Sequence, residues 1–290
     1  MPNILVTGGS GQLAKAIAWA SKGSKNCYTI ADRTELDICN SDTVGEYLRK
    51  HNISVVVNSA AYTNVDAAEE DEQAAYAINS DAVERLATLC KELNIRLIHL
   101  STDYVFGGDK SRTTPYTEGD QTAPMNVYGH SKAEGERSVT EHGGVVIRTS
   151  WLYAPWGKNF VRTILRVAKE KHALSVVDDQ RGRPTSSLGL AEAIVAIIDN
   201  RAIERMSGIY HYADVGDCSW YDFAREIVDI AGIADCKVER CKTHERQMRA
   251  ARPAYSVLDT QRIATIEGVR LESRTERLRR VIKLMEENYE

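Results

Sequence analysis

A glycine-rich segment that directly follows the first apolar run limits the folds open to this chain. Residues 3–6 form that run, and residues 7–14 (Thr-Gly-Gly-Ser-Gly-Gln-Leu-Ala) lead into a helix expected at about 12–21. Glycines let the backbone turn tightly against a pyrophosphate, which then meets the free N–H groups and positive dipole end of the helix. The segment therefore predicts a dinucleotide site with contacts from Gly8, Ser10, Gly11, Gln12 and Leu13.

Strands and helices alternate through the rest of the first half. Apolar runs typical of buried parallel strands recur at residues 28–31, 55–58, 96–100 and 145–148, with helices expected at 42–48 and 79–93. This alternation predicts parallel βαβ units with right-handed crossovers. We therefore expect an α/β fold with a Rossmann-type, doubly wound parallel sheet.

After about Ser150 the alternation loosens. Helices are expected at residues 160–171, 188–198, 221–231 and 274–287, and short strands at 174–177 and 209–212. No repeat or low-complexity linker separates the two halves. We expect a dinucleotide-binding domain over residues 1–150 and a small, mainly substrate-binding α/β region over residues 151–290, packed on the first so that a cleft closes between them.

Composition narrows the functional class. With 290 residues the chain can bury a sizeable core, and a net charge of −4 gives no sign of nucleic-acid binding. Neither a long apolar run nor a signal peptide is present, so no membrane association and a cytoplasmic location are expected. The six cysteines show no Cys-x-x-Cys spacing, and Cys236, Cys241 and His244 match no zinc pattern. Reduced thiols and no metal site are expected.

The end of the second expected strand carries opposing signals about the cofactor. Asp32 can accept hydrogen bonds from an adenosine ribose, whereas Arg33 beside it can pair with a 2′-phosphate. NADPH, NADH or both therefore stay open, with NADPH favoured. Further cofactor contacts are expected from Asp37 and Ile38, near the adenine, and from Ala60, Ala61 and Tyr62, after the third strand.

Tyr128 and Lys132 form the candidate catalytic pair. They lie four residues apart, on one face of a helix expected between the fourth and fifth strands, and no other tyrosine has a lysine at that spacing. A nearby ammonium would lower the pKa of the tyrosine, which could then give a proton to a carbonyl oxygen as a nicotinamide gives hydride to the carbon. Thr102 could polarise that oxygen, and Lys132 could also bind the nicotinamide ribose.

The order and spacing of several short motifs resemble one enzyme family over essentially the whole chain. The chain is similar to the extended short-chain dehydrogenase/reductase superfamily and, more closely, to the dTDP-4-dehydrorhamnose reductases. The matching segments are the glycine loop and residues 60–66, 101–106, 126–129, 148–151, 159–160, 179–185 and 251–253.

The resemblance implies NAD(P)H-dependent reduction of the 4-keto group of dTDP-4-dehydro-6-deoxy-L-mannose to dTDP-L-rhamnose, a step of nucleotide-sugar biosynthesis for cell-surface polysaccharide. Thr102, Tyr128 and Lys132 match the family's catalytic positions. The sugar nucleotide would lie against Asp103, Tyr104, Asn126 and Trp151, with the diphosphate facing arginines among Arg181, Arg183 and Arg252.

One departure from the family concerns magnesium. Some members bind Mg²⁺ at a dimer interface through glutamates, but the matching positions here are Ala16 and Leu188, which cannot ligate a hard cation. Glu192 is the one carboxylate nearby. No obligatory metal is expected, and either a monomer or a homodimer stays open.

Three alternative functions also stay open. The chain could reduce another nucleotide-linked 4-keto-6-deoxysugar. A dehydratase or epimerase is disfavoured, because Asp103 is followed by Tyr104 rather than by a second carboxylate. A non-catalytic relative, such as the regulatory β subunit of methionine adenosyltransferase, is disfavoured by the intact set of Thr102, Tyr128 and Lys132.

Overall fold

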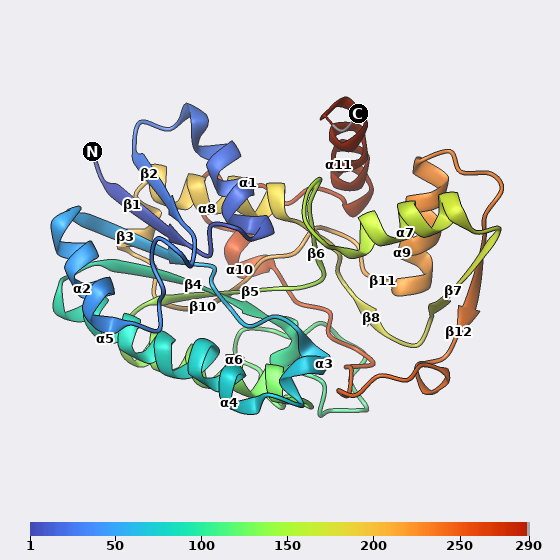
Figure 1. Cartoon of the computed structure of the whole chain (residues 1–290), viewed down its shortest axis with the longest axis horizontal. Coiled ribbons are helices and arrows are strands. Elements are labelled where there is room, and N and C mark those ends of the chain that lie inside the picture. The colour runs from blue at the N-terminus through green and yellow to red at the C-terminus, as the bar shows by residue number, and fades with distance from the viewer. Residues whose placement is uncertain (289–290) are drawn as a thin grey trace.

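A six-stranded parallel sheet forms the centre of the molecule in this computed structural model, which describes residues 1–288 (Figure 1). Its order is β10-β5-β4-β3-β1-β2. The strands are β1 (Asn3–Thr7), β2 (Cys27–Ala31), β3 (Ile53–Asn58), β4 (Arg96–Thr102), β5 (Val145–Thr149) and β10 (Gly208–His211). Every pairing is parallel. The predicted Rossmann-type fold is confirmed.

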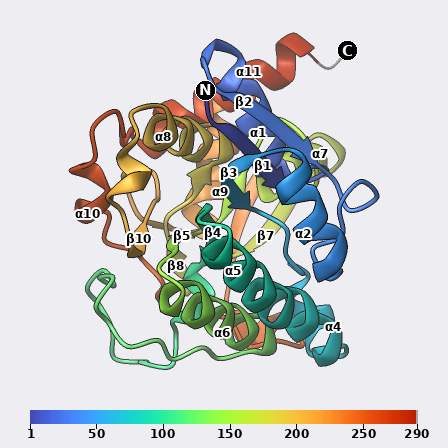
Figure 2. The ribbon, with the colours of Figure 1, turned by 90° about the vertical axis from the view of Figure 1, so that its left-hand side faces the viewer.

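Helices cover both faces of the sheet (Figures 1 and 2). Helices α1 (Gln12–Ala20) and α8 (Ser187–Asp199) pack on one face, where Ile4 and Val6 of β1 are buried against them. Helices α2 (Ser41–Lys50), α5 (Ala82–Glu92) and α6 (Val127–Glu141) pack on the other face, over Leu5 of β1. Strand alternation sends neighbouring side chains to opposite layers, so both faces are apolar and each is covered.

The strand order places a ligand crevice at one point. The chain runs from β1 to β2 on one side of β1, then crosses to β3 on the other side. Ligands of open α/β sheets bind at the carboxyl ends of the strands where the order reverses in this way. The glycine segment after β1 and the residues after β3 meet at that point.

The second half contributes to the central sheet and also builds a smaller lobe. Strand β10 joins the sheet edge beside β5. The lobe pairs β7 (Ala173–Val177) with β12 (Lys237–Cys241) and packs α7 (Phe160–Glu170) against α9 (Trp220–Ile230). The sequence had not predicted β12, whose side chains are mostly exposed and break the apolar pattern of a buried strand. The last two residues of the range expected for this region, 289–290, lie outside the described residues.

The long helix α11 (Arg274–Asn288) and several short elements complete the described chain. The short elements are α3 (Val65–Ala68), α4 (Glu72–Tyr76), α10 (Gln261–Ala264), β6 (Leu152–Tyr153), β8 (Arg181–Gly182), β9 (Thr185–Ser186) and β11 (Cys218–Ser219). All six cysteines are free, as predicted. Within residues 1–288, no helix has the length and apolar character needed to span a bilayer.

Candidate active site

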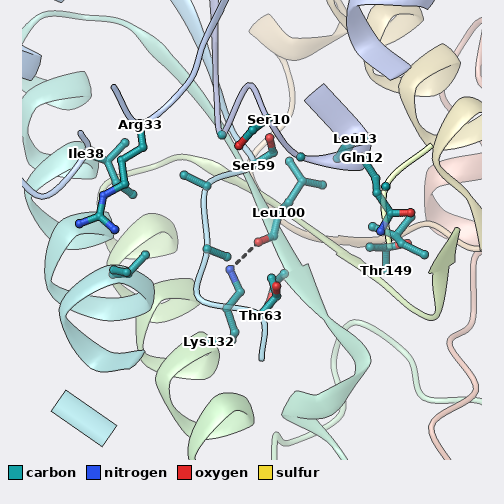
Figure 3. Close-up of a pocket in the computed structure, with 18 of the residues that line it drawn as sticks. Ser10, Gln12, Leu13, Arg33, Ile38, Ser59, Thr63, Leu100, Lys132 and Thr149 are labelled. Carbon is teal, nitrogen blue, oxygen red and sulfur yellow. Dashed lines mark hydrogen bonds between the residues drawn. The ribbon is translucent and has the colours of Figure 1, made fainter. Parts of the chain in front are cut away.

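A cavity of about 490 Å³ opens at the carboxyl ends of β1, β3, β4 and β5 (Figure 3). We call it the first cavity. Of the residues predicted to bind the cofactor, those that line it are Gly8, Ser10, Gly11, Gln12, Leu13, Arg33, Asp37, Ile38, Ala60, Ala61, Tyr128 and Lys132. Asp32 and Tyr62 do not. The sequence had not singled out Cys39, Ser59, Ser101, Thr149 or Lys158, which also line it. Ser101 and Thr149 lie in the matching segments 101–106 and 148–151 but had no assigned role, and no motif marks the other three positions.

Close backbone packing explains the glycines of the loop. Gly8 has φ +73°, and a Cβ there would lie 2.8 Å from the backbone nitrogen of Ala60. The loop after β1 therefore rests directly on the loop after β3, which only glycine permits. Helix α1 begins at this loop, and no side chain caps its N-terminus. Its free N–H groups and dipole remain available to an anion.

Asp32 and Arg33, which gave opposing signals about the cofactor, have different surroundings in the structure. The Oδ1 atom of Asp32 accepts hydrogen bonds from the backbone nitrogen of Thr34 (2.8 Å) and from its hydroxyl (2.6 Å). These bonds lower the pKa of Asp32 and hold its carboxylate on its own turn. Arg33 lines the cavity, with Asp37 as its partner at 3.2 Å. The cationic member of the pair thus faces the site.

Two glycines let helix α6, which carries Tyr128 and Lys132, come close to its neighbours. A Cβ on Gly129 would lie 2.2 Å from the carbonyl oxygen of Tyr104, and one on Gly135 would lie 2.2 Å from that of Asn79. Asn126 caps the helix by accepting from the backbone nitrogen of Gly129 at 2.8 Å. This packing places Tyr128 beside Thr102, whose side chain forms a hydrogen bond with it.

The pKa values correct one expectation about the pair. Burial raises the pKa of Tyr128 to about 12, against the effect of the Thr102 hydrogen bond. The ammonium of Lys132 instead contacts the carbonyl oxygen of Leu100 (2.6 Å) and Nε2 of His99 (3.0 Å). The prediction that Lys132 lowers the pKa of Tyr128 is therefore wrong for this arrangement. Tyr128 keeps its proton at neutral pH, which suits a proton donor.

Asp103 is buried beside Thr102. Its carboxylate accepts hydrogen bonds from the Ser256 hydroxyl at 2.5 Å and the Thr102 hydroxyl at 3.3 Å. Burial nevertheless raises its pKa to about 7. Asp103 thus connects the Thr102 hydroxyl to a residue from the far end of the chain. It contacts Thr102 rather than either cavity.

A second cavity, of about 620 Å³, lies against the smaller lobe, where α7, β7 and the loop at 246–252 line it. Tyr104 lines it, and the ring of Tyr104 packs edge-on to that of Tyr128, with centroids 5.8 Å apart. The two cavities therefore meet at this tyrosine pair. The other lining residues are Phe160, Thr163, Ile164, Val167, Leu174, Ser175, Val176, Val177, Gln180, Trp220, Arg246, Gln247, Met248 and Arg252.

The predicted substrate residues divide between this cavity and its surroundings. Tyr104 and Arg252 line it. Asn126 is buried and donates to the carbonyl oxygen of Ala251 at 2.7 Å. Trp151 stacks on Trp220, with ring centroids 3.5 Å apart, so it supports a lining residue. Arg181 lies outside both cavities, because its guanidinium pairs with Asp217 at 2.5 Å.

Residues 246–248 line the second cavity although the sequence carried no signal for them. They belong to a loop that Asp66 of α3 holds in place. Asp66 accepts from the backbone nitrogens of Arg249 (3.1 Å) and Ala250 (3.0 Å) and from the guanidinium of Arg252 (2.9 Å). Two motifs far apart in sequence, residues 60–66 and 251–253, are therefore parts of one contact.

Comparison with known proteins finds one family model and several reductases that match this chain over most of its length. The family model described as the RmlD substrate binding domain matches residues 2–287. A dTDP-4-dehydrorhamnose reductase of Burkholderia thailandensis is 39% identical over 282 residues, covering 92% of this chain and 94% of that protein. A dTDP-4-keto-6-deoxy-D-glucose reductase of Streptomyces niveus is 36% identical over 271 residues, or 92% of each chain. The crystal structure of a Bacillus anthracis dTDP-4-dehydrorhamnose reductase with NADP matches with TM-score 0.90 at 34% identity, over 98% of this chain and 100% of that one.

Proposed function

Since this chain belongs to the RmlD family of dTDP-4-dehydrorhamnose reductases, we propose that it reduces the 4-keto group of dTDP-4-dehydro-6-deoxy-L-mannose to dTDP-L-rhamnose. It is an NAD(P)H-dependent oxidoreductase of nucleotide-sugar biosynthesis. The observation that carries the proposal is the position of Tyr128, a protonated phenol that lines the first cavity and contacts Tyr104 of the second.

The first cavity fits a nicotinamide dinucleotide. Its glycine loop leaves no space for a Cβ at Gly8, and the uncapped N-terminus of α1 suits a pyrophosphate. The buried hydroxyls of Ser101 and Thr149, which lack a hydrogen-bond partner, belong to residues of its inner wall. Buried hydroxyls are normally paired, so a ligand that brings polar groups to this wall would complete it.

When bound, the reduced nicotinamide supplies hydride to the carbonyl carbon. Tyr128 holds the proton for the carbonyl oxygen, and Thr102 orients that hydroxyl. Lys132 contributes positive charge from the cavity wall. A buried, prearranged donor and cation stabilise developing negative charge better than water does. We propose that the second cavity takes the sugar nucleotide, with its diphosphate near Arg246 and Arg252 on the cavity wall, where Arg252 is also paired with Asp66.

The reaction can be tested directly. The enzyme is incubated with dTDP-4-dehydro-6-deoxy-L-mannose, formed in situ by an epimerase, while NADPH consumption is followed and the product is identified by NMR. We expect net NADPH oxidation and dTDP-L-rhamnose. A dTDP-6-deoxy-L-talose product would mean hydride delivery to the opposite face of the same ketone, and turnover only with another dTDP-4-keto-6-deoxysugar would mean a different substrate. Either result would overturn the assignment of dTDP-L-rhamnose as the product. Absence of nicotinamide consumption with every such sugar would contradict the proposal.

We propose that Arg33 makes NADPH the preferred cofactor, because it lines the cavity while Asp32 is held on its own turn. Arg33→Ala should raise the KM for NADPH roughly 10-fold or more and leave the KM for NADH nearly unchanged, since a charge-assisted hydrogen bond to a phosphate is lost. Steady-state kinetics with both cofactors measure this. Arg201→Ala removes an exposed arginine paired with Glu204 and is the matched control. Equal effects on both cofactors would refute the assignment.

We propose that catalysis needs no divalent metal. Ala16 and Leu188 are both fully buried in the core that α1 and α8 share, and Glu192 pairs with Arg277 (2.6 Å) and Arg280 (2.7 Å). Treatment with EDTA should therefore leave turnover within experimental error, and added Mg²⁺ should not raise it. Loss of activity with EDTA, restored by Mg²⁺, would overturn this. Light scattering under both conditions separates a monomer from a homodimer that forms without metal.

A further inference from the structure

A row of buried polar side chains crosses the central sheet next to the catalytic lysine. Thr7, Asn58 and His99 lie in register on the adjacent strands β1, β3 and β4. Their side chains are at most 1% exposed, and Lys132, also 1% exposed, meets the row from α6. The surrounding positions of these strands are apolar. Polar groups buried in this way are costly unless each is paired, so the row requires an explanation.

The four side chains form a continuous hydrogen-bonded chain. Thr7 Oγ1 lies 2.6 Å from Asn58 Oδ1, and Asn58 Nδ2 lies 3.0 Å from His99 Nδ1. His99 Nε2 lies 3.0 Å from Lys132 Nζ, whose second contact is the carbonyl oxygen of Leu100 at 2.6 Å. Figure 3 shows that second contact, with Lys132 on the cavity wall. Two of the three N–H groups of the ammonium are thus directed at the protein, and one is left for the cavity.

Proton counting specifies what His99 must do. An ammonium has only donors, so a ring that contacts it must present a lone pair on Nε2 and carry its proton on Nδ1. That proton needs an acceptor, which the amide oxygen of Asn58 provides once the amide is turned toward the ring. With the amide nitrogen toward the ring, the ring proton moves to Nε2, an arrangement that suits only a neutral amine. The orientation of the Asn58 amide therefore decides whether the row of side chains suits a charged or a neutral Lys132.

We propose that His99 is a positioning residue that keeps Lys132 charged and aimed into the first cavity, with Asn58 and Thr7 setting its tautomer. The inference rests on the proposed function only in assigning Lys132 a part in the reaction. The neutral ring is favoured because burial and the adjacent Lys132 lower the pKa of His99 well below its usual range.

The surroundings of Lys132 explain why its charge depends on the acceptor that His99 offers. Burial lowers its pKa to about 8, against the effect of Glu136. The other titratable or charged groups around Lys132 come from three elements. Glu136 and Tyr128 lie on α6 with it, and His99 faces it from β4. Asp103 follows β4, and Arg148 of β5 is paired with Glu136. A pKa near 8 leaves the lysine charged at neutral pH by a small margin. If Lys132 lost one hydrogen-bond acceptor, its pKa would fall further, and the lysine would lose its proton near neutral pH.

The test follows Lys132 itself and needs no turnover. The protein is labelled with ¹³Cε-lysine, the Lys132 signal is assigned by its absence in Lys132→Arg, and its titration midpoint is measured by NMR. His99→Phe keeps a planar ring without an acceptor. We expect the midpoint to fall by about one to two pH units, since a hydrogen bond to a charged group is lost. His99→Leu should give the same fall, and His99→Gln, whose amide oxygen can accept, should move the midpoint back toward that of the wild type.

His142→Leu is the control, because His142 lies at the far end of α6 and contacts Thr88 and Ser138. It should leave the Lys132 midpoint unchanged. An unchanged midpoint in a folded Phe or Leu variant at position 99 would overturn the inference, whatever the substrate proves to be. In the kinetic assay, the alkaline limb of kcat should shift to lower pH in the same variants. A lowered Tm without either shift would mean that His99 is merely structural.

Discussion

Tyr128→Phe should lower turnover by roughly 10²–10⁴-fold, the usual loss when a general acid is removed. The substitution deletes only the hydroxyl, and the ring can keep its edge-on contact with Tyr104. Because the pKa of Tyr128 is raised to about 12, the hydroxyl is protonated throughout the neutral range, as the proposed proton donor must be. Dinucleotide binding should persist, since the glycine loop and Lys132 are untouched.

This prediction is measured as kcat at saturating NADPH, with cofactor affinity from calorimetry and Tm as a check on folding. Tyr47→Phe removes the same atom from a tyrosine on α2, outside both cavities, and should have no effect on turnover. Near-normal turnover in Tyr128→Phe would contradict the assignment of Tyr128 as the proton donor. If Tyr104→Phe then abolished activity, the proton donor would be Tyr104 instead.

The second large effect concerns stability. Arg148→Met should lower the free energy of unfolding by about 3–5 kcal/mol, because it leaves Glu136 as an uncompensated buried charge. The side chains of Arg148 and Glu136 are 2% and 4% exposed and 2.6 Å apart, and the pair ties α6 to β5 one turn after Lys132. The guanidinium also lies 4.9 Å from the ring centroid of Phe106. Urea denaturation followed by circular dichroism gives the value.

An exposed ion pair supplies the control for this prediction. Arg166 and Glu170 on α7 are 63% and 54% exposed, so Arg166→Met should cost at most about 1 kcal/mol. Arg148→Met with Glu136→Leu should recover much of the stability that Arg148→Met alone loses. Equal costs for the buried and the exposed arginine would contradict the argument.

Local sequence predicted much of the fold because its signals are local. The run at residues 3–6 and the glycine segment after it became β1 and the loop of the first cavity. The apolar runs at 55–58, 96–100 and 145–148 became three adjacent central strands. Strand periodicity and glycine conformation act over a few residues, so they can be read without knowing the neighbours. The exposed strand β12 lacks that signal and was missed.

The sequence did not predict which partner a charged side chain meets. Both Asp32 and Arg33 were expected at the cofactor, but only Arg33 lines the cavity, because Asp32 bonds to Thr34. Arg181 was expected near the diphosphate and is paired with Asp217 outside both cavities, so its contact with the diphosphate stays a prediction. Which group a charged side chain meets depends on residues far away along the chain, and spacing carries no information about them.

The sequence by itself determined the Rossmann-type sheet, the dinucleotide loop, the four-residue spacing of Tyr128 and Lys132, and the resemblance to one reductase family. Only the tertiary structure decided what surrounds that pair. Burial keeps the proton on Tyr128, and the ammonium of Lys132 meets His99 and Leu100 rather than the phenol. The reason is physical: helical spacing follows from backbone geometry alone, whereas a pKa depends on burial and on partners that only the folded chain brings together.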